Sequence, residues 1–413
     1  MRYIDLFAGA GGLSEGFIKA GFTPVAHVEM DRAACFTLKT RLAYHHLKRT
    51  NQTGRYVDYM RGKISRDDLY SSLPKRLHDS VINSTIGEDT LQDIFARVDT
   101  LAGDKPIDVL AGGPPCQAYS VVGRARDANG MRNDPRNYLY KYYGRFLHRY
   151  QPKAFVFENV LGLRTAADGK YLEDMKKCFD KAGYVVEVDL LRAREFGVLQ
   201  DRKRILIVGW RKDLGITGIP HFKKKDWNYT VADILRDLPE IGPGEGTMKN
   251  ARYRGKATEY LNRSALRNGI DILTQHCARP HTTQDLKIYR IAVERWSMSK
   301  ERMRYTDLPS ALRTHKNTSS FLDRFKVVAA DEPCAHTVVA HIARDGHHYI
   351  HPDVKQNRSL SVREAARLQS FPDDFYFEGV KEDSPRTAAF KQIGNAVPPL
   401  MAESIAMAIK ARL

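Results

Sequence analysis

A single cysteine follows two prolines in the stretch IDVLAGGPPCQAYS, residues 107–120, and is the residue best placed to do chemistry. The apolar start of this stretch predicts a short buried strand that ends at a pair of glycines. Pro114 and Pro115 then fix the backbone angle φ and remove two hydrogen-bond donors, so the loop leaves the strand as a stiff segment. Cys116 therefore lies at the carboxyl end of a strand, where open α/β sheets bind their ligands. A thiol there could be a nucleophile, although a lone cysteine is more often a small buried residue.

Charged side chains with catalytic chemistry follow or precede two other predicted strands. Glu158 comes directly after the apolar residues 154–157. A carboxyl at the end of such a strand is poorly solvated, so we expect it to hold a proton near neutrality. Arg202 and Arg204 precede a predicted strand over residues 205–210, and their spacing of two places both guanidinium groups on one face. An ordinary loop glutamate and a solvated charge run are the simpler interpretations, but attachment to core strands favours a site.

The N-terminal region has the layout of a nucleotide-binding fold. A predicted strand, residues 3–7, is followed by the small residues AGAGG and by an amphipathic helix from Leu13 to about Ala20. Small residues at such a turn let the backbone approach a ligand at a helix N-terminus. Ser14 replaces the third glycine of the dinucleotide pattern G-x-G-x-x-G. A nicotinamide cofactor is therefore less favoured than another adenosine-containing cofactor.

Acidic residues end the next two predicted strands. The second strand, residues 24–30, ends at Glu29, Met30 and Asp31. A carboxylate at this position usually accepts hydrogen bonds from a ribose, and a methionine could lie on the adenine ring. Asp31 could also act as the N-cap of the helix that follows, and the two roles are compatible. Asp89 closes the predicted third strand and is a candidate for the adenine amino group, with its neighbour Glu88 as a competitor.

The composition favours a nucleic-acid partner. Lys and Arg outnumber Asp and Glu by 66 to 49 in 413 residues, which gives a net charge of +17 and favours a polyanion, nucleic acid before an anionic membrane. The five cysteines form no CxxC pair, which argues against disulfides and zinc and for a reducing, cytosolic setting. No run approaches the roughly 18 apolar residues of a membrane span. The predicted strand at the N-terminus is unlike a signal peptide.

Three further segments are distinguished by pattern. Residues 44–84 lose periodicity and are interpreted as an insertion in the α/β core. Residues 121–136 are polar and glycine-rich, as expected of a mobile loop that closes over a substrate. Residues 213–353 are irregular and basic with interleaved aromatic side chains, a composition typical of a nucleic-acid-reading domain. After it, residues 361–364 form a capping box that opens a helix.

Six motifs in this order closely resemble the cytosine-C5 DNA methyltransferases: DLFAGAGG, GGPPCQAYS, ENV, QDRKR, REAARLQSFP and GNAVPP. The resemblance implies a Rossmann-like α/β domain that uses S-adenosylmethionine (SAM), without a metal, and a smaller irregular target-recognition domain. The division is residues 1–212 for the catalytic domain, 213–353 for target recognition, and 354–413 for a C-terminal part that returns to the catalytic domain. Matched by motif, the residues expected to contact SAM are Phe7, Ala10, Gly12, Glu29, Met30, Asp89, Pro115, Leu139 and Asn395.

The resemblance also implies a mechanism that agrees with the residues. The thiolate of Cys116 attacks C6 of a flipped-out cytosine, and protonated Glu158 at N3 stabilises the charge that develops. Arg204 holds the base O2, and Arg202 supports the loop and the intermediate. The expected enzyme is a sequence-specific DNA cytosine-C5 methyltransferase of the bacterial restriction-modification type. We expect a cytoplasmic, nucleoid-associated monomer that acts on double-stranded DNA beside a cognate restriction endonuclease, without stable binding to it and without a membrane.

Three alternatives remain at the level of sequence. The tRNA-methylating branch of the same fold has a smaller recognition region, so the long basic region favours duplex DNA. A non-catalytic DNA- or SAM-binding protein is disfavoured because Cys116, Glu158 and Arg204 are all intact. A nicotinamide oxidoreductase is the weakest alternative, given Ser14 and the lack of a hydride-transfer constellation.

Overall fold

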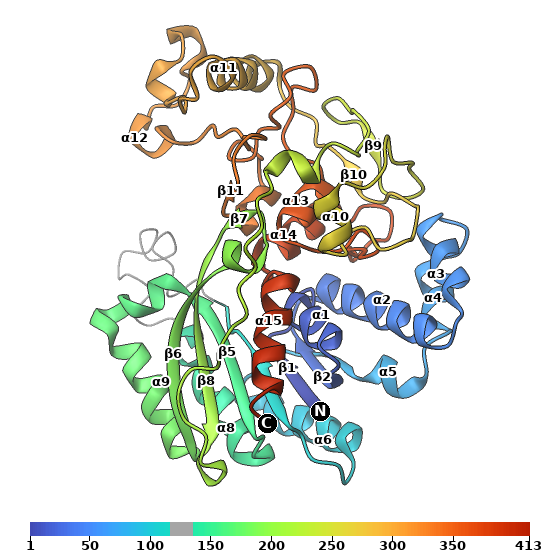
Figure 1. The fold of residues 1–413 in the computed structure, drawn as a ribbon, viewed down its shortest axis with the longest axis vertical. Helices are drawn as coiled ribbons and strands as arrows, with labels where there is room; N and C mark the ends of the chain where they lie inside the picture. Colours follow the sequence, from blue (N-terminus) through green and yellow to red (C-terminus); the bar gives the residue numbers. More distant parts are fainter. Residues whose placement is uncertain (116–134) are drawn as a thin grey trace.

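A seven-stranded sheet with the order β3-β2-β1-β4-β5-β8-β6 lies at the centre of the molecule (Figure 1). The structure is a computed structural model that describes residues 1–115 and 135–413. The strands β1 to β5 pair in parallel, whereas β8 is antiparallel to both β5 and β6. The strands are β1 (Arg2–Leu6), β2 (Thr23–Glu29), β3 (Val81–Asn83), β4 (Val109–Gly112), β5 (Ala154–Val160), β6 (Tyr184–Arg192) and β8 (Lys203–Arg211). This is the α/β fold that the sequence predicts.

Both faces of the sheet are buried, each under its own helices. Side chains alternate along a strand, so Val156 of β5 packs in one layer and Phe155 in the other. Burial on both faces explains why these strands are nearly continuous apolar runs in the sequence. One layer contains α1 (Gly12–Lys19) and α15 (Pro399–Lys410), and the opposite layer contains α6 (Glu88–Ala102), α8 (Leu139–Tyr150) and α9 (Lys170–Lys181) (Figure 1).

The C-terminal helix α15 returns to the N-terminal half of the chain and packs along α1 (Figure 1). A Cβ atom on Gly16 would lie 2.3 Å from the backbone nitrogen of Glu403, and one on Gly12 would lie 2.2 Å from the carbonyl oxygen of Val397. The two glycines therefore permit a backbone approach that no other residue allows. The segment GNAVPP thus crosses the N-terminal glycine turn, as the resemblance implies.

The segment 44–84 is helical rather than loose. The helix α2 (Arg32–Arg49) runs through its start and is followed by α3 (Thr53–Met60), α4 (Arg66–Tyr70) and α5 (Lys75–Asp79). Helices of five to eight residues are not stable alone, so tertiary contacts must hold them. Tyr59 and Thr40 each donate a hydrogen bond of 2.6 Å to the buried carboxyl of Glu378. These distant partners explain why the local pattern does not predict the helices.

Two predicted helix starts are confirmed. Asp31 accepts hydrogen bonds from the backbone nitrogens of Ala33 and Ala34 at the start of α2. Ser361 and Glu364 form the predicted capping box of α13 (Val362–Leu368). Each cap satisfies N–H groups that the first helical turn leaves unpaired.

The basic region contains two parts with different cores. Residues 283–327, which we call the upper lobe, carry α11 (Thr283–Ser299) and α12 (Thr318–Phe321) and stand out at the top of Figure 1. The strand β11 (Ala335–His336) follows in a segment that returns to the main core. A small separate core, including Tyr289, Val293 and Phe325, stabilises this lobe. Residues before the lobe pack into the main core with α13 and include β9 (Gly246–Thr247), α10 (Glu259–Arg263) and β10 (His276–Cys277). The helix α14 (Arg386–Asn395) follows α13 below the lobe.

Candidate active site

The base of the Cys116 loop lies against Glu158. A Cβ atom on Gly113 would lie 2.6 Å from the carbonyl oxygen of Glu158 and 3.0 Å from its Oε2, so this contact requires glycine. Asn159 donates a hydrogen bond of 3.3 Å from Nδ2 to the carbonyl oxygen of Pro114. Cys116 and the predicted clamp, as far as residue 134, lie outside the described residues. The described start of the loop, as far as Pro115, therefore lies beside Glu158.

Glu158 and Arg204 face each other across two neighbouring strands. The strands β5 and β8 pair so that Val160 lies opposite Arg204. Nε of Arg204 lies 2.8 Å from Oε1 of Glu158, and both side chains are largely buried. Apart from this ion pair, Oε1 of Glu158 has no hydrogen-bond partner among the described residues. The carboxyl thus keeps hydrogen-bonding capacity for a ligand at the point where the loop begins.

Arg202 and Arg204 do not form one cationic pair, contrary to the sequence prediction. The strand ladder is interrupted at Arg202, between β7 (Gln200–Asp201) and β8. Its buried guanidinium donates hydrogen bonds to the carbonyl oxygens of Val338 and Ala396, both at 2.8 Å, and of Gly394 at 3.3 Å. Arg204 instead lies beside Glu158. The alternation rule fails here because it holds only inside a continuous strand.

The N-terminal glycine turn has an unusual backbone that opens space for a ligand. Phe7, directly after β1, has φ = 56°, and Gly9 and Gly11 have φ = 54° and 84°. A left-handed conformation costs a phenylalanine about 1 kcal/mol or more, and such strain clusters at ligand sites. A Cβ atom on Gly9 would meet nothing within 4 Å. The turn therefore presents open backbone at the carboxyl edge of the sheet.

Glu29 connects this turn to the end of β2. Its Oε2 accepts a hydrogen bond of 2.8 Å from the backbone nitrogen of Gly9, and its Oε1 accepts one of 2.7 Å from that of Asp31. Burial raises the pKa of Glu29, and these backbone N–H groups oppose the rise. Met30, next to it, is 61% exposed. The carboxyl is thereby held in place beside an apolar side chain that is open to a ligand.

The predicted third strand is misplaced in the sequence. It lies at residues 81–83 and ends at Asn83, whereas Asp89 is the second residue of α6. Asn83 donates hydrogen bonds from Nδ2 to the carbonyl oxygens of Glu29 and Met30, both at 3.0 Å. The residue at the strand end that adjoins the Glu29 region is therefore Asn83. Sequence reasoning missed it because three residues carry too short an apolar pattern.

The remaining predicted cofactor contacts are divided among three segments. Ala10 is buried in the glycine turn, and Gly12 begins α1 under the carbonyl group of Val397. Asn395 is the exposed last residue of α14. Leu139 begins α8, the first long helix after the Cys116 loop. The N-terminal glycine turn and the segment after Asn395 therefore pack against each other. Leu139, in contrast, lies on a helix of the opposite layer.

Asp5 of β1 is a buried carboxyl that the sequence did not single out. It is 1% exposed, and neither of its oxygens has a hydrogen-bond partner among the described residues. Burial raises the pKa of Asp5 to about 8, and the neighbouring carboxyl of Glu29 adds to the rise. A carboxyl without a partner is costly to ionise in an apolar environment. Asp5 is therefore protonated in the folded protein at neutral pH.

We expect Asp5→Asn to stabilise the protein increasingly as the pH rises from 4 to 8. Below pH 4 the carboxyl is protonated in both states; between pH 4 and 8 only the unfolded chain ionises it, so wild-type stability falls. The slope is about 1.4 kcal/mol per pH unit. Urea unfolding at pH 5 and 7.5 should therefore show the difference between variant and wild type growing by about 3 kcal/mol. Asp93→Asn, at an exposed position on α6, is the control, and a pH-independent difference for Asp5→Asn would contradict the prediction.

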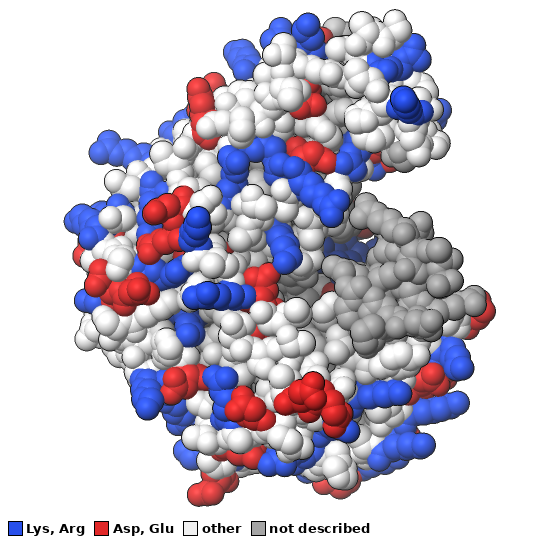
Figure 2. Space-filling view, turned by 180° about the vertical axis from the view of Figure 1, so that it is seen from behind, with Lys and Arg blue, Asp and Glu red and all other residues white. Residues whose placement is uncertain are grey.

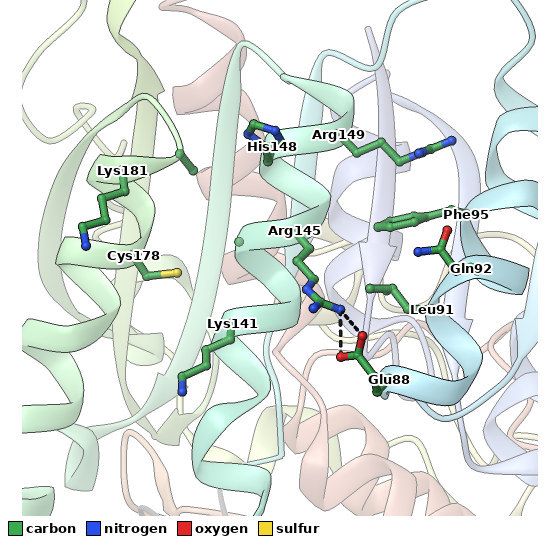
Figure 3. Close-up of a pocket in the computed structure, with 12 residues that line it drawn as sticks. Glu88, Leu91, Gln92, Phe95, Lys141, Arg145, His148, Arg149, Cys178 and Lys181 are labelled. Atoms are coloured by element: carbon green, nitrogen blue, oxygen red, sulfur yellow. Dashed lines mark hydrogen bonds and ion pairs between the residues drawn. The ribbon is translucent and has the colours of Figure 1, made fainter.

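A groove of about 670 Å³ between α6, α8 and α9 lies away from these residues. Of its twelve lining residues only Glu88, the competitor of Asp89, is a candidate from the sequence. Figure 3 shows Arg145 pointing from α8 to Glu88 on α6, and the two make hydrogen bonds of 2.8 and 2.9 Å. Arg149 pairs likewise with Asp99. Lys141 and Lys181 also line the groove, so its lining is basic in spite of these two pairs.

The residues at the carboxyl edge fit a nucleotide-like cofactor. The open backbone at Gly9, the held carboxyl of Glu29 and the exposed Met30 are the groups that a ribose and an adenine would contact. No group of three or more His, Cys, Asp or Glu side chains in the described part of the chain could hold a metal. Within the same residues, no helix is long and apolar enough to cross a membrane.

The fold is that of the Rossmann-like methyltransferases. A putative DNA modification methyltransferase encoded within an E. coli prophage has a TM-score of 0.64 and 22% identity, covering all of this chain and 99% of its own. The methyltransferase EhMeth of Entamoeba histolytica has a TM-score of 0.56 and 11% identity, covering all of this chain and 98% of its own. At these low identities, the two similarities show the fold and nothing beyond it.

The chain belongs to the C-5 cytosine-specific DNA methylase family, which it matches over residues 1–66 and 78–411. It is therefore a DNA cytosine-C5 methyltransferase. It is 42% identical to the Type II methyltransferase M.Bpa9945I of Bacillus paralicheniformis, over 99% of this chain and 98% of that protein. It is 32% identical to the Type II methyltransferase M1.HphI of Haemophilus parahaemolyticus, over 99% of this chain and 86% of that protein. The family match leaves out residues 67–77, a segment much shorter than the insertion that the sequence predicts at residues 44–84.

Proposed function

We propose that this enzyme methylates C5 of one cytosine within a specific duplex sequence, after flipping that base out of the helix. The observation that carries the proposal is the pair Glu158 and Arg204, which lies beside the start of the Cys116 loop. A protonated carboxyl and a guanidinium both donate hydrogen bonds, so they are complementary to the acceptors N3 and O2 of cytosine. A base inside a duplex cannot reach such an edge, so it must be extruded.

The chemistry requires a nucleophile because cytosine C5 alone is too weak to accept a methyl group. The thiolate of Cys116 forms a bond to C6, and Glu158 donates a proton toward N3, so C5 gains enamine character. Arg204 holds O2. SAM, when bound, supplies the electrophilic methyl group. After methylation a base removes the C5 proton and the bond between Cys116 and C6 breaks, which restores the thiolate.

Arg202 contributes by position in this proposal. Its guanidinium is engaged by the carbonyl groups of Val338, Gly394 and Ala396. Arg202 thereby supports the strand that carries Arg204. In this proposal only Arg204 contacts the intermediate. The predicted contacts to SAM are those of the glycine turn, the end of β2 and Asn395, with Pro115 and Leu139 on the side of the loop. Asp89 on α6 and Asn83 at the strand end are competing candidates for the adenine amino group.

The surface supports a duplex as substrate. Figure 2 shows the surface hollowed below the upper lobe, with Lys and Arg side chains along the upper wall of the hollow. The net charge of +17 agrees with a polyanion in this hollow. The upper lobe, with its own small core, would then read bases on one side of the duplex while the sheet edge receives the flipped cytosine.

The names of the relatives support a role in a type II restriction-modification system. Two relatives that align with 99% of this chain are named Type II methyltransferases. A cognate endonuclease would cut the same sequence when it is unmethylated, and it need not bind this enzyme stably. We place the enzyme in the bacterial cytoplasm, acting as a monomer on the nucleoid.

Transfer of labelled methyl groups from SAM tests this function. Unmethylated genomic DNA and total tRNA are incubated separately with the purified protein, and bisulfite sequencing locates the product. Label in DNA at C5 of one recurring sequence supports the proposal. Label only in tRNA would assign the enzyme to RNA, and no label with SAM still bound would make it a non-catalytic member of the family.

A further inference from the structure

The segment Gln200–Arg202 joins the sheet to β11, in the segment that returns from the upper lobe to the main core. The strand β7 pairs in parallel with β11, so that Gln200 lies opposite Ala335. Thr337 donates a hydrogen bond of 2.5 Å from Oγ1 to the carbonyl oxygen of Asp201, and the backbone nitrogen of Val338 donates one of 2.9 Å to Oε1 of Gln200. A displacement that the lobe transmits to residues 335–338 therefore acts on residues 200–202.

The same segment is bonded to the C-terminal end of α14. Nη1 of Arg202 donates to the carbonyl oxygen of Val338, and Nη2 donates to that of Ala396, both at 2.8 Å. One buried side chain thus connects Val338, in the segment that returns from the lobe, with the residue directly after Asn395. The packing around it leaves no slack, because a Cβ atom on Gly394 would lie 2.2 Å from the backbone nitrogen of Ala340.

Gln369, the C-cap of α13, completes the junction. It is fully buried, and its Oε1 accepts a hydrogen bond of 2.6 Å from Nε2 of Gln200. Its own Nε2 donates to the carbonyl oxygens of Ile393 at 2.8 Å and Ala396 at 2.9 Å. A single amide therefore bonds the strand β7 to both sides of Asn395. We call Gln200, Arg202, Thr337 and Gln369 the junction.

We propose that the junction couples DNA binding by the upper lobe to SAM binding beside Asn395, with Gln369 as a positioning residue. This inference rests on the proposed function, since it takes the lobe as the DNA reader and Asn395 as a SAM contact. Close-packed, hydrogen-bonded contacts transmit a displacement instead of absorbing it. Occupation of one site then favours the arrangement of residues 393–396 that suits the other. Linkage requires the effect to be equal in both directions.

Gln369→Met tests the coupling, with Gln275→Met as the matched control. Methionine has a similar length but removes the donor and the acceptor. Gln275 is also fully buried, and among the described residues its side-chain amide bonds only the backbone of Phe377, away from the junction. Affinities for S-adenosylhomocysteine, which permits no turnover, are measured with and without a duplex that carries the mapped site. Affinities for the duplex are measured with and without S-adenosylhomocysteine.

In the wild type and in Gln275→Met we expect each ligand to strengthen the binding of the other by the same factor, about 5- to 150-fold. In Gln369→Met this factor should fall below about twofold. If Gln369 had a purely structural role, its replacement would weaken the binding of each ligand. The factor by which one ligand strengthens the binding of the other would then stay unchanged. Thr337→Val, which removes one bond from the lobe side, should lower the factor in part and replaces Gln369→Met if that variant does not fold.

Two results would overturn the inference. One is an unchanged coupling factor in Gln369→Met, or in Thr337→Val where that variant replaces it. The other is a wild type that binds both ligands without any coupling, in which case the proposed function still stands. A wild type that binds neither S-adenosylhomocysteine nor the duplex would contradict the proposed function, and with it this inference.

Discussion

Cys116→Ala is expected to abolish methyl transfer, with a loss of roughly 10⁴- to 10⁶-fold in rate, the size of effect seen when a covalent nucleophile is removed. Alanine cannot add to C6, so C5 of cytosine never becomes nucleophilic enough to accept the methyl group. Binding of SAM should persist, because most of its predicted contacts lie on other segments, the glycine turn and the Glu29 region among them, and Pro115 is unchanged. Methyl transfer to the mapped duplex in single-turnover conditions measures the loss, and binding of the cofactor measures its survival.

The matched control is Cys178→Ala. Cys178 is a free, half-buried cysteine on α9, and it is not among the predicted site residues. Its replacement should leave the rate of methyl transfer within about twofold, as is usual for positions without a special role. If Cys116→Ala keeps more than a tenth of the wild-type rate, Cys116 is not the nucleophile.

Glu158→Gln is expected to lower the rate of methyl transfer by roughly 10²- to 10⁴-fold, the usual contribution of a general acid. Glutamine preserves the size of the side chain and can still donate a hydrogen bond from its amide, but it cannot transfer a proton to N3. The variant therefore separates proton transfer from hydrogen bonding. Affinity for the duplex should change little, since the base contact is kept, so the loss should appear in kcat rather than in KM.

Glu187→Gln serves as the control for this variant. Glu187 lies on the neighbouring part of the same sheet, in β6, and its Oε1 accepts a hydrogen bond of 2.8 Å from the backbone nitrogen of Gly218. A glutamine oxygen can accept the same bond, so activity should stay close to that of the wild type. A Glu158→Gln variant with equal activity would show that Glu158 transfers no proton in the rate-limiting step.

The sequence alone determined the parts of the site that follow long apolar strands. The four strands β1, β2, β4 and β5 are predicted by runs of buried side chains. Phe7 and Met30 follow β1 and β2, and Glu158 lies near the carboxyl end of β5, which continues to Val160. Because parallel strands share one carboxyl edge, the order of these motifs is enough to collect their side chains at one place. The two caps at Asp31 and Ser361 are equally local, since each depends on residues within one helical turn.

The tertiary structure alone decided what depends on partners distant in the chain. The short helices α3 and α4 are stabilised by the segment around Glu378, more than 300 residues away, so their own sequence carries little signal. The third strand has only three residues, so its pattern is too short to be recognised. The sequence therefore predicted a strand end at Asp89, whereas the strand ends at Asn83. Arg202 and Arg204 have the same chemistry and a spacing of two, yet they have different partners because the strand is interrupted at Arg202. Arg202 donates hydrogen bonds to backbone carbonyl groups, whereas Arg204 pairs with Glu158. Local periodicity encodes which residues enter a strand or helix, whereas the partner of a buried polar group is fixed only when the distant segments meet.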